Sequence, residues 1–146
     1  MADTMPVDEN CLFCKIVAGL IPCARVYEDE KVLAFLDINP INRGHTLVLP
    51  KAHFPSLLEL PDSEGESLLR GLRLVAGAVQ KQTRCGGFNC IQNNFASAGQ
   101  VIFHSHWHII PRFNSDGLPD WPGGAYSDSK EMEELARSIN AHILKA

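Results

Sequence analysis

The stretch that decides the fold and its chemistry is His104-Ser105-His106-Trp107-His108-Ile109-Ile110, in which histidine occupies every second position. Side chains alternate across a β-strand, so the pattern predicts a strand over residues 103–110 with three imidazoles on one face. Six histidines in 146 residues would give such a triplet by chance in about one shuffled chain in a hundred. The run therefore carries functional information.

Three interpretations of the run compete. Alternate histidines on a strand can share a catalytic metal ion, but such a site usually recruits a carboxylate, and no acidic residue follows His108 before Asp116. A neutral imidazole, with an ordinary pKa of about 6.5, can instead attack phosphorus while its neighbours hold the phosphate. The structural alternative is a solvent-exposed polar face on an edge strand. Because the chain has neither a Walker-type phosphate loop nor an obvious carboxylate cluster for Mg²⁺, we favour the nucleophile.

Composition and charge limit the class of protein. A content of 45% hydrophobic and 21% charged residues is typical of one globular domain, expected over residues 11–146 after a flexible N-terminus at residues 1–10. The net charge of -4 offers no basic surface for nucleic acid. No apolar run approaches the roughly 18 residues of a membrane span, and residues 1–10 do not resemble a signal peptide. With no disulfide pattern among its five cysteines, we expect a cytoplasmic protein.

Apolar periodicity predicts the secondary structure. Strands are expected over residues 25–28, 31–37, 45–49, 88–92 and 103–110. A short helix is expected from Cys11 to Gly19, a long one from a capping box of Ser63 and Glu66 to the Gly86-Gly87 pair, and a last one near the C-terminus. The C-terminal stripe consists of Met132, Leu135, Ala136, Ile139 and Ile143. Because helices and strands do not alternate strictly, we predict an α+β fold around a five-stranded, mostly antiparallel sheet.

The chain resembles the histidine-triad (HIT) family, whose signature H-x-H-x-H-x-x matches residues 104–110 except for the small Ser105. Cys-Leu-Phe-Cys-Lys-Ile-Val at 11–17, the segment at 26–38, and Gly-His-Thr-Leu-Val-Leu-Pro-Lys-Ala-His at 44–53 are similar to Hint-type members. This resemblance implies a HIT-like fold and an enzyme that cleaves a P–N or P–O bond of a nucleoside phosphoramidate, dinucleoside polyphosphate or similar conjugate. The rival function is a nucleotide-binding regulatory protein with little activity.

Site residues follow from the same resemblance. His106 would be the nucleophile that forms a nucleotidyl-histidine, His108 would bind phosphate and help to protonate the leaving group, and His45 would support His108. Asp37 would hold the ribose hydroxyls, as a carboxylate can accept both bonds of a diol. The base pocket and the phosphate contacts would comprise Phe13, Ile16, Phe35, Ile38, Leu47, Asn93, Gln100 and Val101, with Asn94 as the alternative to Asn93 and core packing as the alternative for the apolar members.

One departure from relatives concerns Val101, where Hint-type and Fhit-type members usually carry Ser or Thr. A lost hydroxyl donor weakens a polar leaving-group contact by about 1 kcal/mol, so the preference for the leaving group is expected to differ. The family further implies a homodimer built on the long helix and the strand near Phe88. Trp121, in a Trp-Pro-Gly segment that is also Hint-like, could reach a neighbouring site.

Cys11-x-x-Cys14 is half of a zinc site by spacing, and its structural alternative is a pair of buried thiols at the start of a helix. Similarity to zinc-containing HIT proteins adds His53 and His104 as ligands. A closed Cys₂His₂ site has no open position for substrate, so the implied zinc is structural and His104 is a ligand rather than a chemical participant.

Overall fold

The computed structural model describes residues 4–144, which form two compact units, one ending at Asp116 and one beginning at Gly117. The first unit contains every predicted site residue. The prediction of a single domain over residues 11–146 stays a prediction. Within the described residues, none of the helices is long and apolar enough to cross a membrane.

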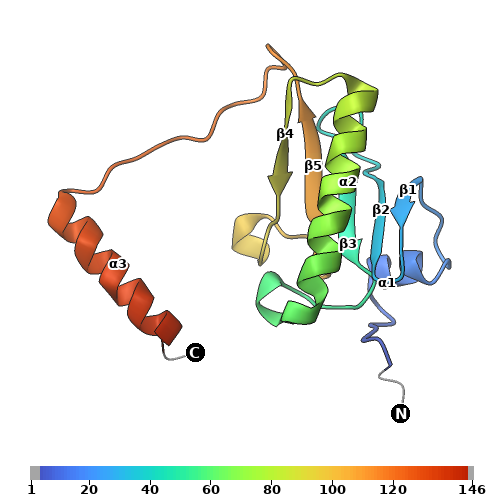
Figure 1. The fold of residues 1–146 in the computed structure, drawn as a ribbon, viewed down its shortest axis with the longest axis horizontal. Helices are drawn as coiled ribbons and strands as arrows, with labels where there is room; N and C mark the ends of the chain where they lie inside the picture. The colour runs from blue at the N-terminus through green and yellow to red at the C-terminus, as the bar shows by residue number, and fades with distance from the viewer. Residues whose placement is uncertain (1–3, 145–146) are drawn as a thin grey trace. The chain divides into compact units, whose positions relative to one another are not determined.

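A five-stranded sheet forms the centre of the first unit, in the order β1-β2-β3-β5-β4 (Figure 1). Its strands are β1 (Arg25–Glu28), β2 (Val32–Leu36), β3 (Thr46–Pro50), β4 (Gly87–Ile91) and β5 (Trp107–Arg112). Each neighbouring pair is antiparallel, which confirms the predicted sheet. The acidic corner between β1 and β2 is closed by Asp29, whose carboxylate accepts the N–H groups of Lys31 and Val32.

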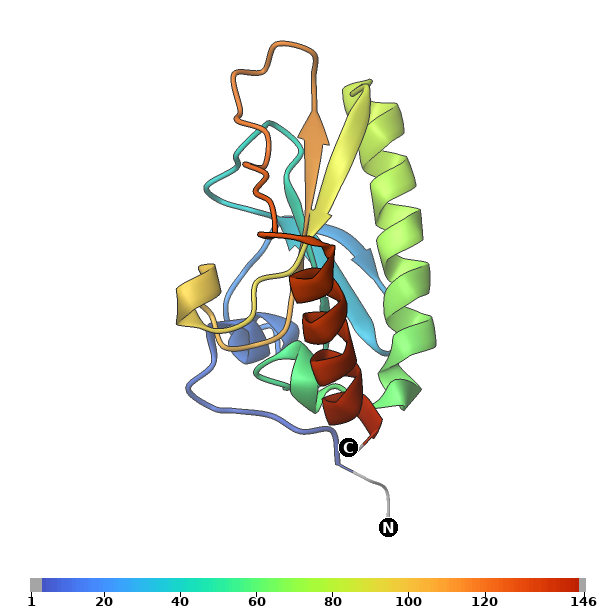
Figure 2. The same cartoon turned by 90° about the vertical axis from the view of Figure 1, so that its left-hand side faces the viewer.

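Helices cover both faces of the sheet (Figure 2). On one face Val32, Ala34, Val48 and Ile109 pack against the long helix α2 (Gly65–Thr83). On the other face, alternate residues of the same strands pack against the short helix α1 (Leu12–Val17), which contributes Phe13 and Ile16. Because β2 and β3 are buried on both sides, their sequences read as nearly continuous apolar runs.

The predicted capping box of α2 is wrong. Ser63 lies in a 3-10 helix, η2 (Asp62–Glu64), and no side chain caps the first turn of α2. A capping box forms instead at the earlier 3-10 helix η1 (Leu57–Glu59), where Ser56 and Glu59 bond each other's backbone. Both Ser-x-x-Glu pairs fit the pattern, and only the path of the connection decides between them.

The strand predicted over residues 103–110 begins four residues later, at Trp107, so His104 and His106 precede β5 and only His108 lies in it. Strand pairing fails there because the partners are taken. Pro50, the last residue of β3, gives its carbonyl to the His104 ring (2.8 Å), and the Ser105 N–H donates to Phe54 (2.7 Å). The three imidazoles therefore do not share one strand face, and this part of the prediction is corrected.

The second unit contains helix α3 (Ser129–Leu144), which confirms the predicted C-terminal helix. Asp128 precedes it and accepts the backbone N–H of Glu131 (2.8 Å), as an N-cap residue does.

Candidate active site

A cavity of about 630 Å³ lies on the α1 side of the sheet. The predicted residues that line it are Phe13, Ile16, Phe35, Asp37, Ile38, Leu47, Asn93, Val101, His106 and His108. Two predicted residues do not line it, since His45 lies behind His108 and Gln100 is buried in the preceding loop. Further lining residues that the sequence did not single out are Leu12, Pro22, Cys23, Ala24, Leu36, Asn39, Gly99 and Ile102. Five of them flank predicted residues in the sequence, whereas Pro22, Cys23 and Ala24 have no such signal.

A chain of hydrogen bonds fixes the tautomer of His108. The backbone N–H of Ile41 donates to His45 Nδ1 (3.1 Å), so the ring proton of neutral His45 must lie on Nε2. That nitrogen lies 2.8 Å from His108 Nδ1, which can then only accept. The proton of His108 is thereby placed on Nε2, from which it can be donated to a phosphate or a leaving group.

His106 is fixed in the complementary sense. Its Nδ1 lies 2.6 Å from the backbone carbonyl of His104, which can only accept, so Nδ1 carries the proton. Nε2 consequently bears the lone pair. Phe13 packs edge-on against the ring at 5.0 Å, and the His108 ring lies 5.1 Å away. The cavity therefore contains one imidazole with a free lone pair beside one with a free N–H.

Burial keeps these imidazoles neutral. It lowers the pKa of His45 and of His106, and it lowers the pKa of His108 to about 4, helped there by the neighbouring histidines. The Asp37 carboxylate opposes this trend, because it lies 3.6 Å from His45 Nε2 and favours the charged form. A neutral imidazole near pH 7 is what a nucleophile requires.

The loop before β5 presents Asn93 to the cavity, while Asn94 is used for structure. The Asn94 side-chain oxygen accepts the N–H of Leu57 (2.7 Å) and does not line the cavity. Gln100 is 4% exposed, and its amide bonds three backbone groups of the loops around it. Gln100 therefore shapes the loop from inside, whereas its neighbours Gly99 and Val101 line the cavity.

The predicted base-pocket residues fall into two groups. Phe13, Ile16, Phe35 and Leu47 are buried members of the core cluster and also form the cavity wall, and their contact with a base stays a prediction. Ile38 differs, because its side chain is 93% exposed at the rim. A planar base could enter between this apolar wall and rim.

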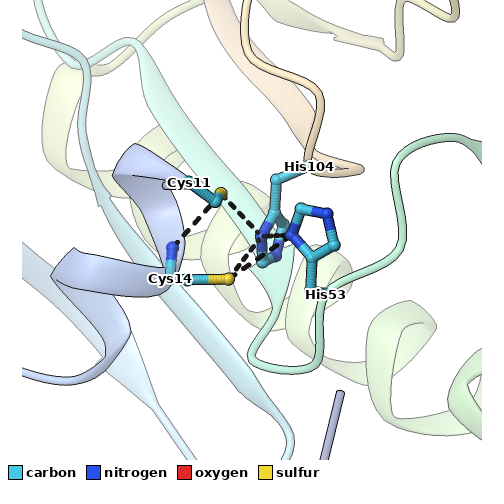
Figure 3. Close-up of side chains that lie close together, drawn as sticks. All are labelled: Cys11, Cys14, His53 and His104. Atoms are coloured by element: carbon cyan, nitrogen blue, oxygen red, sulfur yellow. Dashed lines mark hydrogen bonds between the residues drawn. The ribbon is translucent and has the colours of Figure 1, made fainter. Parts of the chain in front are cut away.

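The four predicted zinc ligands converge next to the cavity (Figure 3). Cys14 Sγ lies 3.4 Å from His53 Nδ1 and 3.6 Å from His104 Nδ1, and these two nitrogens are 3.3 Å apart. A tetrahedral ion with Zn–S of about 2.3 Å and Zn–N of about 2.05 Å would place S and N about 3.55 Å apart and two nitrogens about 3.35 Å apart. The separations of these three atoms therefore fit one tetrahedral cation.

The chemistry of the cluster fits as well. His104 Nε2 bonds the Pro50 carbonyl and so carries the proton, which leaves Nδ1 free as a ligand. Burial raises the pKa of the Cys14 thiol to about 11, so this thiol ionises at neutral pH only against a cation. These four residues could hold a metal ion, as predicted.

A second group, Asp37, His45 and His108, also has potential ligand atoms within 4.8 Å of one another. The 2.8 Å contact between the two rings is a hydrogen bond, and it is too short for two nitrogens on one tetrahedral ion. Asp37 thus supplies the carboxylate that is absent from the sequence directly after His108, but the short contact between the rings favours a hydrogen-bonded pair over a catalytic metal.

The family model of the HIT domain matches residues 18–115, a range that includes His45, His106 and His108. This chain belongs to the HIT family. A protein from Streptococcus mutans UA159, known from its crystal structure, is 45% identical, with a TM-score of 0.89 over 93% of this chain and 87% of that one. A zinc-bound HIT protein from Mycobacterium smegmatis is 36% identical, with a TM-score of 0.71 over 93% and 96%.

Two relatives of this HIT protein are named as enzymes. An adenylylsulfatase from Arabidopsis thaliana is 38% identical over 97% of this chain and 73% of its own length. An adenosine 5'-monophosphoramidase from Schizosaccharomyces pombe is 39% identical over 92% and 98%. These two relatives carry the Hint-type names HINT3 and hnt1, which confirms the predicted branch of the family. Their named activities confirm the prediction of a HIT-family enzyme.

Proposed function

We propose that this HIT protein hydrolyses or transfers a nucleoside monophosphate through a covalent intermediate on His106. The observation that carries the proposal is the tautomer of that ring. With Nδ1–H bound to the His104 carbonyl, the lone pair is on Nε2 of a residue that lines the cavity. His108, with the opposite tautomer, supplies the donor that the leaving group needs.

The cavity suits a nucleotide along its whole length. The base would lie against Phe13 and Ile16, and Asp37 would accept the ribose hydroxyls. The phosphate would then lie between Nε2 of His106 and Nε2–H of His108, with the Asn93 amide as a further donor.

In the first step His106 Nε2 attacks phosphorus, a P–N bond to the ring forms, and the bond to the leaving group breaks. The leaving atom keeps the bonding electrons, accepts a hydrogen bond from His108 Nε2–H and takes a proton from solvent. Water then attacks the same phosphorus, and the bond to His106 breaks, so that Nε2 regains its lone pair. The proton that water loses returns to solvent, and the nucleoside monophosphate is released, so atoms and protons balance over the cycle.

Charge around the cavity favours a short, singly charged linkage over a polyphosphate chain. Among the described lining residues there is no lysine or arginine, and Asp37 is acidic. Each additional phosphate charge would meet a carboxylate without a compensating cation, at a cost of about 1 kcal/mol. A nucleoside phosphoramidate or mixed anhydride therefore fits better than a dinucleoside polyphosphate.

The test combines rapid quenching with mass spectrometry. Adenosine 5'-phosphoramidate should give a nucleotide adduct on His106, and H106A should lose both adduct and turnover, while H142A in the second unit serves as the control. Equal turnover in H106A would refute the covalent mechanism. Tight AMP binding without any turnover by the wild type would instead support the regulatory alternative. Diadenosine polyphosphates should have a kcat/KM lower by about tenfold or more.

We further propose that the Cys₂His₂ cluster holds a structural zinc ion. Bound there, zinc would link α1 to the segments after β3 and before β5. Elemental analysis should find about one zinc per chain, and removal of the zinc should lower the melting temperature. A metal-free protein of unchanged melting temperature would overturn the proposal.

A homodimer is proposed from the edge of the sheet. β4 is an edge strand within the described sheet, and Phe88 and Cys90 project from it partly exposed. Edge strands with apolar side chains tend to pair with another chain. F88D should convert a dimer to a monomer in light scattering, whereas L20D at an exposed position outside the sheet should not.

The cytoplasmic location also stays our proposal.

A further inference from the structure

His104 belongs to both sites at once. Its ring nitrogen Nδ1 lies 3.4 Å from Cys11 Sγ and 3.6 Å from Cys14 Sγ, within the metal-binding cluster. Its backbone carbonyl accepts the Nδ1–H of His106 at 2.6 Å, the bond that fixes the tautomer of the nucleophile. One residue therefore connects the cluster to the reacting imidazole.

The connection is stiff on both sides of that carbonyl. His104 is fully buried, and its ring is held from the other side by the Pro50 carbonyl. Ser105 is anchored by its N–H to Phe54 and by its hydroxyl to Gln92. Because Ser105 is fixed, a movement of His104 must rotate the peptide that joins the two residues. This peptide contains the His104 carbonyl, which His106 contacts.

Helix α1 provides a second connection. Cys11 caps the helix, with its Sγ near the N–H of Cys14 at 3.4 Å, and both thiols belong to the cluster. From the same six-residue helix, Phe13 and Ile16 form part of the cavity wall. Phe13 also packs edge-on against His106. A helix this short is not stable on its own, so its placement depends on such tertiary contacts.

We propose that His104 is a positioning residue for the nucleophile, so that metal binding in the cluster and nucleotide binding in the cavity strengthen each other. The nucleotide half of this inference rests on the proposed function. Coupling between two sites is reciprocal in binding free energy. A metal ion that orders His106 and Phe13 must itself be retained more strongly when a nucleotide occupies the cavity.

The first experiment needs no nucleotide. Histidine ¹⁵N NMR of the folded protein reports which ring nitrogen of His106 is protonated, and replacing Zn²⁺ by the larger Cd²⁺ perturbs the cluster without unfolding the chain. We expect the His106 signals to shift with the metal while those of His142 do not. His106 signals that are identical with both ions would overturn the positioning role.

The second experiment measures the zinc affinity at equilibrium by competition with a chelator, first without ligand and then with AMP, inorganic phosphate or adenosine at concentrations that calorimetry shows to be saturating. We expect AMP to tighten zinc binding about fivefold or more, the lower end of typical coupling. Phosphate alone tests the connection through His104, and adenosine alone tests the one through α1. A zinc affinity that is the same with and without AMP would overturn the coupling.

A pair of variants separates the two connections. F13L should remove most of the adenosine effect and keep the phosphate effect, whereas V17A, on the same helix but outside the cavity, should keep both. If AMP does not bind at all, the proposed function fails, while the NMR comparison still decides the inference about His104.

Discussion

Two substitutions of His45 test whether its hydrogen bond to His108 matters for the chemistry. The ring makes one bond with each nitrogen, to Ile41 N–H and to His108 Nδ1, and it is 2% exposed. An asparagine amide reaches the place of Nδ1, and a glutamine amide reaches the place of Nε2. H45N thus keeps an acceptor for Ile41 and loses the donor to His108, and H45Q does the reverse.

Each variant loses one hydrogen bond between neutral groups, which costs about 1 kcal/mol of stability. In a chain of this length that lowers the melting temperature by roughly 2–4 °C, so both proteins stay folded. Their activities should differ. Without its donor, the buried His108 is no longer held with the proton on Nε2, and a loss of about 1.4–2.7 kcal/mol corresponds to about a 10- to 100-fold lower kcat for H45N. H45Q should stay within about tenfold of the wild type.

The assay is release of AMP from adenosine 5'-phosphoramidate at saturating substrate, with melting curves in parallel. H45N and H45Q with the same kcat would refute the tautomer argument. A fall in activity that follows the melting temperature alone would assign His45 a purely structural role.

Four other outcomes are expected. Because burial lowers the pKa of His45, and that of His108 to about 4, both rings are neutral at neutral pH, so kcat/KM should stay level near neutrality and its acidic fall should lie below pH 6.5; a midpoint near 6.5 in the pH profile would contradict this. D37N should raise KM about tenfold for adenosine 5'-phosphoramidate but leave the 2',3'-dideoxy analogue unaffected, as steady-state kinetics can show. Q100A, which leaves three backbone groups without their bonds, should lower the free energy of unfolding by about 2–3 kcal/mol in urea titrations. V101S should raise kcat/KM up to about fivefold for polar leaving groups and leave stability unchanged; no gain would show that the position does not contact the leaving group.

The local features of this protein could be predicted from the sequence. The apolar stripe of α2, the continuous apolar runs of β2 and β3 and the Cys11-x-x-Cys14 spacing depend on residues within a few positions of one another. Periodicity and spacing over a few residues are properties of single helices and strands. The α+β sheet and half of the metal-binding cluster could therefore be predicted from the sequence.

Features that depend on how elements meet were decided by the tertiary structure. β5 begins only at Trp107 because a ring nitrogen of His104 takes the Pro50 carbonyl that a longer strand pair would need. His45 and His108 are 63 residues apart and share a hydrogen bond whose direction depends on a third backbone group. Neither spacing nor propensity contains that information, because hydrogen-bond partners distant in the chain are chosen only when the sheet and its connections are packed. The sequence alone determined which residues could do the chemistry, while packing determined which nitrogen of each histidine is free to do it.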